Sequence, residues 1–295
     1  MPASSRVLEL TSPPPLAREL LRAAVARRPS RPAEVPRLDV KLRHFAPDPV
    51  QLARYREVCG FPSDGYLPLP FPQVLAAPLH IALLNHPDFP YRLLGMIHVR
   101  NRIHQHRRLE EGTPLSVHTW VEGQREVRQG RELDLHTHVE VDGTLVWSAF
   151  TTMLRRLPGG DARPREPKPV GPTEEDARFA HSRPASWSVP EDTGRRYARA
   201  SGDYNPIHLY ALTARLFGFP RAIAHGMWTV GRCVAEMGEA AEAPALTLTS
   251  DFRRPLLLPS RVVFQTAPQG DGGVAYRVRA EDGQPHVHGL LTPGA

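Results

Sequence analysis

Asp203 and His208 are the residues whose types and spacing most clearly suggest chemistry. They stand at the two ends of the run Asp203-Tyr204-Asn205-Pro206-Ile207-His208. A carboxylate and an imidazole that face each other across a water molecule can move protons in both directions. Adding water to an activated double bond, or removing it, requires proton transfer of this kind. The pair therefore suggests general acid–base catalysis.

The residues between the pair predict how it is held. Asn205 suits the N-cap of a helix and Pro206 its first position, so that His208 falls at the third position. Asp203 precedes the turn, which can bring both side chains to the same side of the helix entrance. The alternative is that Asp203 and Asn205 only cap backbone groups while His208 packs in the core, and the spacing alone leaves both interpretations open.

An internal repeat indicates which elements surround this segment. Three stretches of the first half resemble stretches of the second half in the same order: 71–81 and 219–229, 101–114 and 250–259, 141–143 and 281–283. Several matches in order at a similar offset indicate two copies of one structural unit.

Each copy is predicted to be a helix followed by strands. Ile223, Met227, Val230 and Val234 form an apolar stripe at helical spacing, and the matching helix of the first copy is expected over 76–84. Alternating or β-rich runs follow at 96–103, 115–121, 132–141 and 144–154, and again at 246–252, 261–266, 274–280 and 286–291. We therefore expect an α+β fold in which an antiparallel sheet wraps around one helix, twice.

Proline-rich stretches predict the boundaries between these units. The 32 prolines gather near residues 13–15, 29–36 and 158–172, which is typical of connecting segments. The predicted organisation is an N-terminal extension (1–37), a first half (38–157), a linker (158–183) and a second half (184–295).

Composition limits the class of protein. With 41% hydrophobic and 23% charged residues, the 295-residue chain can bury a large core, and no apolar run approaches the ~20 residues that span a bilayer. The net charge of +6 favours an anionic partner, but no nucleic-acid-binding motif appears. Two cysteines and a poor secretory signal favour a reducing, cytoplasmic location.

The segment around Asp203 resembles the signature of the MaoC-like family of type 2 enoyl-CoA hydratases and acyl dehydratases. The resemblance is carried by 202–208, by Gly218-Phe219-Pro220 and by Ala224-His225-Gly226-Met227. It is close over about 187–232, and the repeat extends it loosely over most of the chain. It implies a double hot-dog fold in which only the C-terminal copy is catalytic. The first copy lacks Asp-x-Asn-Pro-x-His and has Pro78 at the position aligned with Gly226, where proline offers no backbone donor.

By resemblance, Asp203 and His208 would activate the water that attacks C3 of a trans-2-enoyl thioester and return its other proton to C2, giving a 3R-hydroxyacyl thioester. Asn205 would orient His208 or the substrate. The backbone N–H of Gly226, at the N-terminal end of a helix expected to start near Ile223, would bind the thioester carbonyl where negative charge develops. The implied reaction needs neither a cofactor nor a metal.

Further residues are expected to contact the substrate, whose carrier is coenzyme A or acyl carrier protein. Arg253 and Arg254 could meet phosphates, although exposed arginines are more often only solvated. Tyr204 and His225 flank the proposed centre, and His225 is expected to brace its loop. The family often has an acidic residue where this chain has Tyr210, a departure that bears on how the helix entrance is braced or which acyl chain fits and not on the implied chemistry.

Several alternatives remain open. A thioesterase on the same scaffold would use an acidic residue of the helix to activate water against the carbonyl, and a non-catalytic acyl-thioester binding protein would need no such group. The pairs His104/His106, His136/His138 and His286/His288 could ligate a metal, but no third ligand stands at a recognisable spacing, so no metal site is predicted. Family likeness slightly favours a homodimer over a monomer.

Overall fold

The computed structural model describes residues 6–15, 19, 22, 34–93, 95–156 and 174–294. The first part contains β1 (Arg6–Leu10), β2 (Leu38–Phe45), α2 (Pro49–Cys59), α3 (Phe71–Leu84), β3 (Met96–Gln105), β4 (Leu115–Val121), β5 (Arg125–Val127), β6 (Gly130–Val141) and β7 (Thr144–Arg156). The second contains α4 (Glu174–Arg178), β8 (Ala185–Val189), α5 (Thr193–Ser201), a 3₁₀ helix (Pro206–His208), α6 (Ala211–Arg215), α7 (Gly226–Met237), β9 (Leu246–Phe252), β10 (Ser260–Gln269), β11 (Gly273–Ala280) and β12 (Pro285–Pro293), with two more short 3₁₀ helices at Gly238–Ala241 and Gly270–Gly272.

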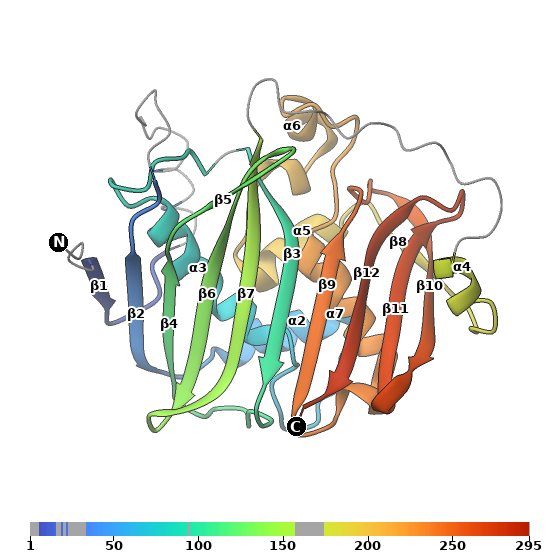
Figure 1. Ribbon diagram of the computed structural model, residues 1–295, viewed down its shortest axis with the longest axis horizontal. Coiled ribbons are helices and arrows are strands. Elements are labelled where there is room, and N and C mark those ends of the chain that lie inside the picture. Colours follow the sequence, from blue (N-terminus) through green and yellow to red (C-terminus); the bar gives the residue numbers. More distant parts are fainter. Residues whose placement is uncertain are drawn as a thin grey trace.

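All the described strands belong to one sheet (Figure 1). The order β1-β2-β4-β6-β7-β3-β9-β12-β11-β10-β8 runs across the molecule, and β5 pairs with β6 beside this path. The pairing is antiparallel except between β1 and β2. Read outward from the centre, β3-β7-β6-β4-β2 has the same connectivity as β9-β12-β11-β10-β8. The sheet is therefore built from two equivalent five-stranded units, and β1 is an addition at one edge.

An approximate two-fold axis passes between β3 and β9. The sequence repeat aligns Asn101 with Ser250, and in the sheet these two residues face each other. On either side, Arg100 faces Asp251 and Arg102 faces Thr249. A residue at a two-fold axis must face its own counterpart. The repeat found in the sequence is thus the symmetry of the fold, which is the predicted double hot-dog architecture.

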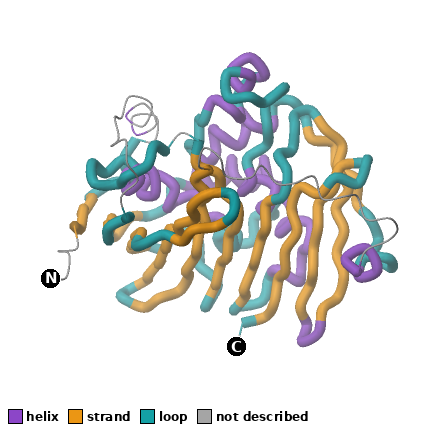
Figure 2. Tube along the Cα trace, turned by 45° about the horizontal axis from the view of Figure 1, so that its top comes forward, coloured by secondary structure: helices purple, strands orange, loops and turns teal. Residues whose placement is uncertain are grey.

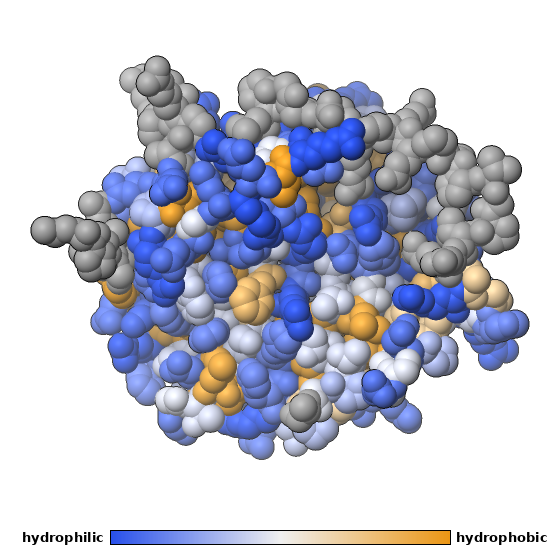
Figure 3. All heavy atoms as spheres, viewed as in Figure 1, coloured by the Kyte–Doolittle hydropathy of each residue, from blue (hydrophilic) through white to orange (hydrophobic). Residues whose placement is uncertain are grey.

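The helices cover one face of the sheet (Figure 2). α3 packs against β2, β4 and β6, and α2 packs against α5 and α7. Alternate residues of a strand point toward this layer, as in β4, where buried and half-buried residues alternate along the strand. Hydrophilic residues prevail on the opposite, outer face (Figure 3).

One continuous core joins the two halves. Tyr55 of α2 and Tyr197 of α5 each stand five residues before the glycine that ends their helix, and their ring centroids lie 6.1 Å apart. Gly231 of α7 lies so close to α2 that a Cβ there would be 2.8 Å from the Tyr55 hydroxyl and 3.0 Å from the Cys59 sulfur. Because the core is shared in this way, neither half has a complete core of its own.

The strand predictions are confirmed, and two helix starts are corrected. All eight predicted strand segments are strands. The second helix begins at Gly226, not near Ile223, because Ile223 lies in an extended segment that bridges to Leu257. The helix of the first copy begins at Phe71, so Pro78 lies in its interior and not at its start.

Parts of the predicted extension and linker are ordered elements of the sheet region. β1 lies within the predicted N-terminal extension and pairs with β2. α4 lies within the predicted linker, and Asp176 in it accepts hydrogen bonds from Arg277 and Arg279 of β11. Residues 157–173 of the predicted linker lie outside the described residues. No helix in the described part of the chain is both long and apolar enough to cross a membrane.

Candidate active site

A chain of local hydrogen bonds builds the turn between α5 and the 3₁₀ helix. Gly202 ends α5 in the left-handed conformation, at φ 77°. The Ser201 hydroxyl then accepts from the Asp203 N–H (3.2 Å), Asp203 Oδ1 from the Asn205 N–H (3.1 Å), and Asn205 Oδ1 from the Ile207 N–H (3.4 Å). The predicted cap at Asn205 is confirmed, with Pro206 first and His208 third in the helix, although the helix is a single 3₁₀ turn.

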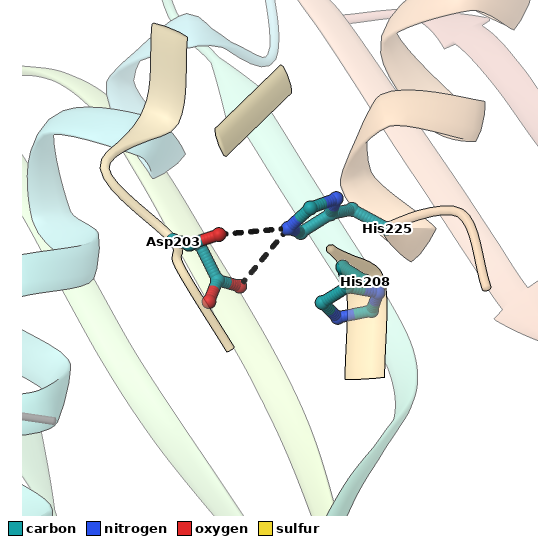
Figure 4. Close-up of side chains that lie close together, drawn as sticks. All are labelled: Asp203, His208 and His225. Atoms are coloured by element: carbon teal, nitrogen blue, oxygen red, sulfur yellow. Dashed lines mark hydrogen bonds and ion pairs between the residues drawn. The ribbon is translucent and has the colours of Figure 1, made fainter. Parts of the chain in front are cut away.

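Asp203, His208 and His225 meet beside the start of α7 (Figure 4). One carboxylate oxygen and one nitrogen of each imidazole all lie within 4.8 Å of one another. Both histidines are buried, whereas the Asp203 side chain is 36% exposed. The carboxylate therefore faces the side from which water or a substrate can arrive.

The backbone fixes the tautomer of His208. Its Nδ1 lies 2.8 Å from the Ile223 carbonyl oxygen, which can only accept a hydrogen bond. Nδ1 therefore carries the proton, and Nε2 has a free lone pair. Burial lowers the pKa of His208, against the opposing effects of Asp203 and of this hydrogen bond. A neutral imidazole with a free Nε2 can act as a base at neutral pH.

His225 contacts the other side of the pair. Its Nε2 donates to the Asp203 carbonyl oxygen (3.0 Å) and lies 3.8 Å from the Asp203 carboxylate. Its ring stacks on His208, with centroids 3.7 Å apart and planes inclined by 26°. Burial, followed by the neighbouring His208, lowers the pKa of His225 to about 3. It is thus a neutral donor that fixes both Asp203 and His208.

Among the described residues, this trio is the one cluster with metal-ligand spacing. A metal ion bonds to imidazole in the plane of the ring, and two rings stacked face to face do not share such a plane. The arrangement therefore suits proton transfer better than metal binding. The three His-x-His pairs do not assemble into such a cluster, and His136, for example, stacks on Trp120.

Gly226 is the first residue of α7, where helix N–H groups have no partner within the helix. The helix dipole also favours negative charge at this end. A Cβ on Gly226 would lie 2.7 Å from a ring carbon of Phe252, so this position needs glycine for close packing. The predicted place of Gly226 at a helix start is thus correct, and Phe252 is a neighbour that the sequence did not reveal.

Further residues near the site were not anticipated. His98 of β3 packs its ring against Phe252 at 4.7 Å, so that the first half contributes one side chain beside the start of α7. Gly194 of α5 lies against the 3₁₀ helix, and a Cβ there would be 1.9 Å from the His208 carbonyl oxygen. No short motif marks either residue, because each contact depends on how distant elements pack.

The remaining predicted residues are more peripheral. Tyr204 is exposed beside Asp203, and the Asn205 side chain is used to cap the 3₁₀ helix. Arg253 and Arg254 directly follow Phe252, but their side chains bond to His288 and Gln284 respectively. A contact of any of these residues with a substrate remains a prediction.

The corresponding turn of the first half lacks the pair. α2 ends at Gly60, which has φ 85°, just as α5 ends at Gly202. One and six residues after this glycine stand Phe61 and Tyr66, in place of Asp203 and His208. Phe61 stacks on Tyr55 at 5.9 Å, and Tyr66 lies under the Arg108 guanidinium at 3.9 Å. This turn is a packing element.

Comparison with known proteins agrees with this picture. Residues 169–292 match the model of the MaoC like domain. The chain is 34% identical over 277 residues to 3-hydroxyacyl-thioester dehydratase X of Mycobacterium tuberculosis, covering 92% of this chain and 95% of that protein. A crystal structure of HtdX from Mycobacterium tuberculosis superposes with a TM-score of 0.73 at 31% identity, covering 87% of this chain and all of that one. A MaoC-like dehydratase from Phytophthora capsici shares the fold, with a TM-score of 0.66 at 17% identity, over 88% of this chain and 96% of that one.

Proposed function

The chain belongs to the family of MaoC-like dehydratases, and from this premise we propose that it interconverts enoyl and 3-hydroxyacyl thioesters by adding or removing water. The observation that carries the proposal is the pairing of a neutral, buried His208 with the half-exposed Asp203. The substrate we propose is a trans-2-enoyl thioester, and the product its 3R-hydroxyacyl form.

The geometry supports a sequence of steps in which each proton and electron pair has a defined destination. Water held by Asp203 gives a proton to Nε2 of His208 while its oxygen bonds to C3. The electron pair of the double bond moves toward the thioester oxygen, where the Gly226 N–H at the start of α7 stabilises the negative charge. The enolate then takes the proton back at C2, so that one water has been added in total. The reverse order gives dehydration.

A thioesterase is less well supported. That activity would use an acidic residue on the central helix, placed to activate water against the carbonyl. The acidic residue of α7 is Glu236, in its last turn, and it is paired with Arg232 at 2.8 Å. α3 contains no acidic residue. A purely binding role would not require the free base that the His208 tautomer provides.

The carrier, the compartment and the oligomeric state that we propose are consistent with the composition and the fold. The thioester carrier is coenzyme A or acyl carrier protein, which are both anionic and suit the net charge of +6. The two buried cysteines are free, as expected of a cytoplasmic enzyme. A homodimer is compatible with the fold, but the double unit already supplies a dimer-like sheet.

The reaction type is tested with crotonyl-CoA and a medium-chain enoyl-CoA. The absorbance of the conjugated thioester should fall with the wild type without release of free thiol, and Asp203→Asn should abolish most of the change. Release of thiol at the rate of the absorbance change would identify a thioesterase instead. If neither signal appears with coenzyme A thioesters or with an acyl-carrier-protein thioester, the proposed reaction is wrong.

A further inference from the structure

An apolar surface lies directly beside the proposed active site. Of the ten large hydrophobic side chains that are exposed among the described residues, five fall within 204–217. Leu212 and Leu216 are 73% and 80% exposed, and Tyr204, Tyr210 and Phe217 accompany them. Figures 1 and 2 show α6, which carries Leu212, standing out from the layer of the other helices. We call these five residues the α6 platform.

Hydrogen bonds connect the platform to the turn that carries Asp203 and His208. The Thr213 hydroxyl donates to the Pro206 carbonyl oxygen (2.6 Å), and Arg195 of α5 donates to the Leu209 carbonyl oxygen (2.9 Å). Tyr204, at one end of the platform, is the neighbour of Asp203. A partner seated here would lie at the entrance to the Asp203–His208 pair.

The chain segment that carries the platform has an excess of arginines over acidic residues, although Glu191, Asp192 and Glu236 directly flank it. Residues 193–235 contain six arginines and one acidic residue, Asp203. Arg196 and Arg232 form ion pairs with Glu57 and Glu236. The other four, Arg195, Arg199, Arg215 and Arg221, form no salt bridge among the described residues. Arg195 instead lies 5.0 Å from the Tyr210 ring, and Arg215 and Arg221 bond to carbonyl oxygens at the exposed surface.

We propose that the α6 platform docks an acidic helix of an acyl carrier protein, which would present the acyl thioester to the Asp203–His208 pair. This inference rests on the proposed function and selects the carrier. The phosphates of coenzyme A would explain the arginines but not the exposed leucines. Contiguous exposed apolar side chains beside a charged rim are typical of a protein contact.

A second copy of the chain fits the platform less well. In a symmetric dimer the same patch faces itself, so the arginines that form no salt bridge among the described residues would approach those of the other subunit. Like charges facing each other across an interface disfavour association. An acidic partner meets both the apolar side chains and the positive charge.

The test compares two substrates that carry the same acyl group: crotonyl-CoA, and a stand-alone bacterial acyl carrier protein loaded with a crotonyl group. The variants are Leu216→Ser and Arg215→Glu, with Val50→Ser on α2 as an exposed apolar control far from the site in sequence. We expect kcat/KM for the carrier-protein substrate to fall about tenfold in both platform variants. The value for crotonyl-CoA should stay within about twofold, because the reacting groups are untouched. The control should change neither value.

Several outcomes would overturn the docking proposal. An equal loss with both substrates would mean that the platform only supports the catalytic turn, and no loss with either would mean that it does not dock the carrier. If the wild type is a dimer by native mass and the variants are monomers, the platform is an interface with a second copy of the chain. Hydration of crotonyl-CoA alone by the wild type would leave the proposed function intact and refute the docking. Hydration of neither substrate would refute the proposed function itself.

Discussion

The two halves of the molecule have the same architecture, and α2 and α5 end in the same way, yet only the turn after α5 brings a carboxylate and two imidazoles together among the described residues. α2 and α5 both end at a left-handed glycine, Gly60 and Gly202. After Gly60 the chain places Phe61 and Tyr66 against the fold, whereas after Gly202 it places Asp203 and His208 around a common point. Because the sheet architecture is common to both halves, the few residues after the cap are what distinguish this site from the matching turn.

The presence of the 3₁₀ helix in the second half alone also explains why α3 and α7 begin at different points of the repeat. Phe71-Pro72 opens α3, but the matching Phe219-Pro220 is followed by an extended segment, and α7 begins only at Gly226. In the second half, the Ile223 N–H donates to the Ile207 carbonyl oxygen, and the Ile223 carbonyl oxygen accepts from His208. The 3₁₀ helix that carries His208 thus holds the segment before α7 extended. As a result, the start of α7 lies beside Asp203, His208 and His225.

The largest effect is expected from removing the first half. A fragment of residues 184–295 would expose the edge of β9 that pairs with β3, and the face of α7 that packs on α2. Unpaired strand edges and bare apolar faces favour aggregation. We expect the fragment to be insoluble or unfolded and inactive, by sedimentation and circular dichroism. A soluble fragment that hydrates crotonyl-CoA would show that the halves are independent.

Gly226→Ala should have the next largest effect. The added methyl group would meet the Phe252 ring and displace the start of α7 from the thioester oxygen. Loss of one such donor typically lowers kcat by about 10²- to 10³-fold. Steady-state hydration of crotonyl-CoA measures this, with circular dichroism to confirm folding. An unchanged kcat would remove Gly226 from the proposed mechanism.

Pro78→Ala tests the aligned position in the first half. Pro78 lies inside α3, where proline lacks a backbone donor and disturbs the helix. The substitution should leave kcat unchanged and raise the free energy of unfolding, by up to about 3 kcal/mol. Urea denaturation gives the stability. A loss of activity comparable to that of Gly226→Ala would mean that α3 takes part in the reaction.

The smallest expected effect is a shift of the pH profile in His225→Ala. Burial lowers the pKa of His208, so its base form persists below the usual pKa of an imidazole, and activity falls only when Nε2 is protonated. Removing the stacked His225 ring admits water, which raises the pKa of His208 toward its ordinary value. The acidic limb of the pH profile of kcat/KM should therefore move to higher pH. A limb that stays in place or moves to lower pH would contradict this role.

The sequence predicted the elements whose signals are local. In β6, for example, the apolar residues Leu133, Leu135, Val139 and Val141 stand on alternate positions between polar residues. Asn205 and Pro206 mark a helix start by their own chemistry. The repeat aligned Asn101 with Ser250 correctly because both copies keep that strand register.

What the sequence could not predict depends on contacts between distant elements. Similar stretches at 71–77 and 219–225 are helical in one half and extended in the other, because only the second meets the 3₁₀ helix. The stacking of His225 on His208 and the approach of Phe252 to Gly226 follow from how α7, β9 and the 3₁₀ helix pack together. No spacing along the chain encodes these contacts.

The most direct test of the account compares His208→Ala with Tyr66→Ala, its counterpart six residues after the helix-ending glycine of the first half. Both proteins should fold, and kcat/KM for crotonyl-CoA hydration is measured for each. We predict a loss of about 10²- to 10⁴-fold for His208→Ala, as for removal of a general acid–base group, and a change of only a few-fold for Tyr66→Ala. Retained activity in folded His208→Ala, or an equal loss in Tyr66→Ala, would contradict the conclusion that the chemistry belongs to the second half.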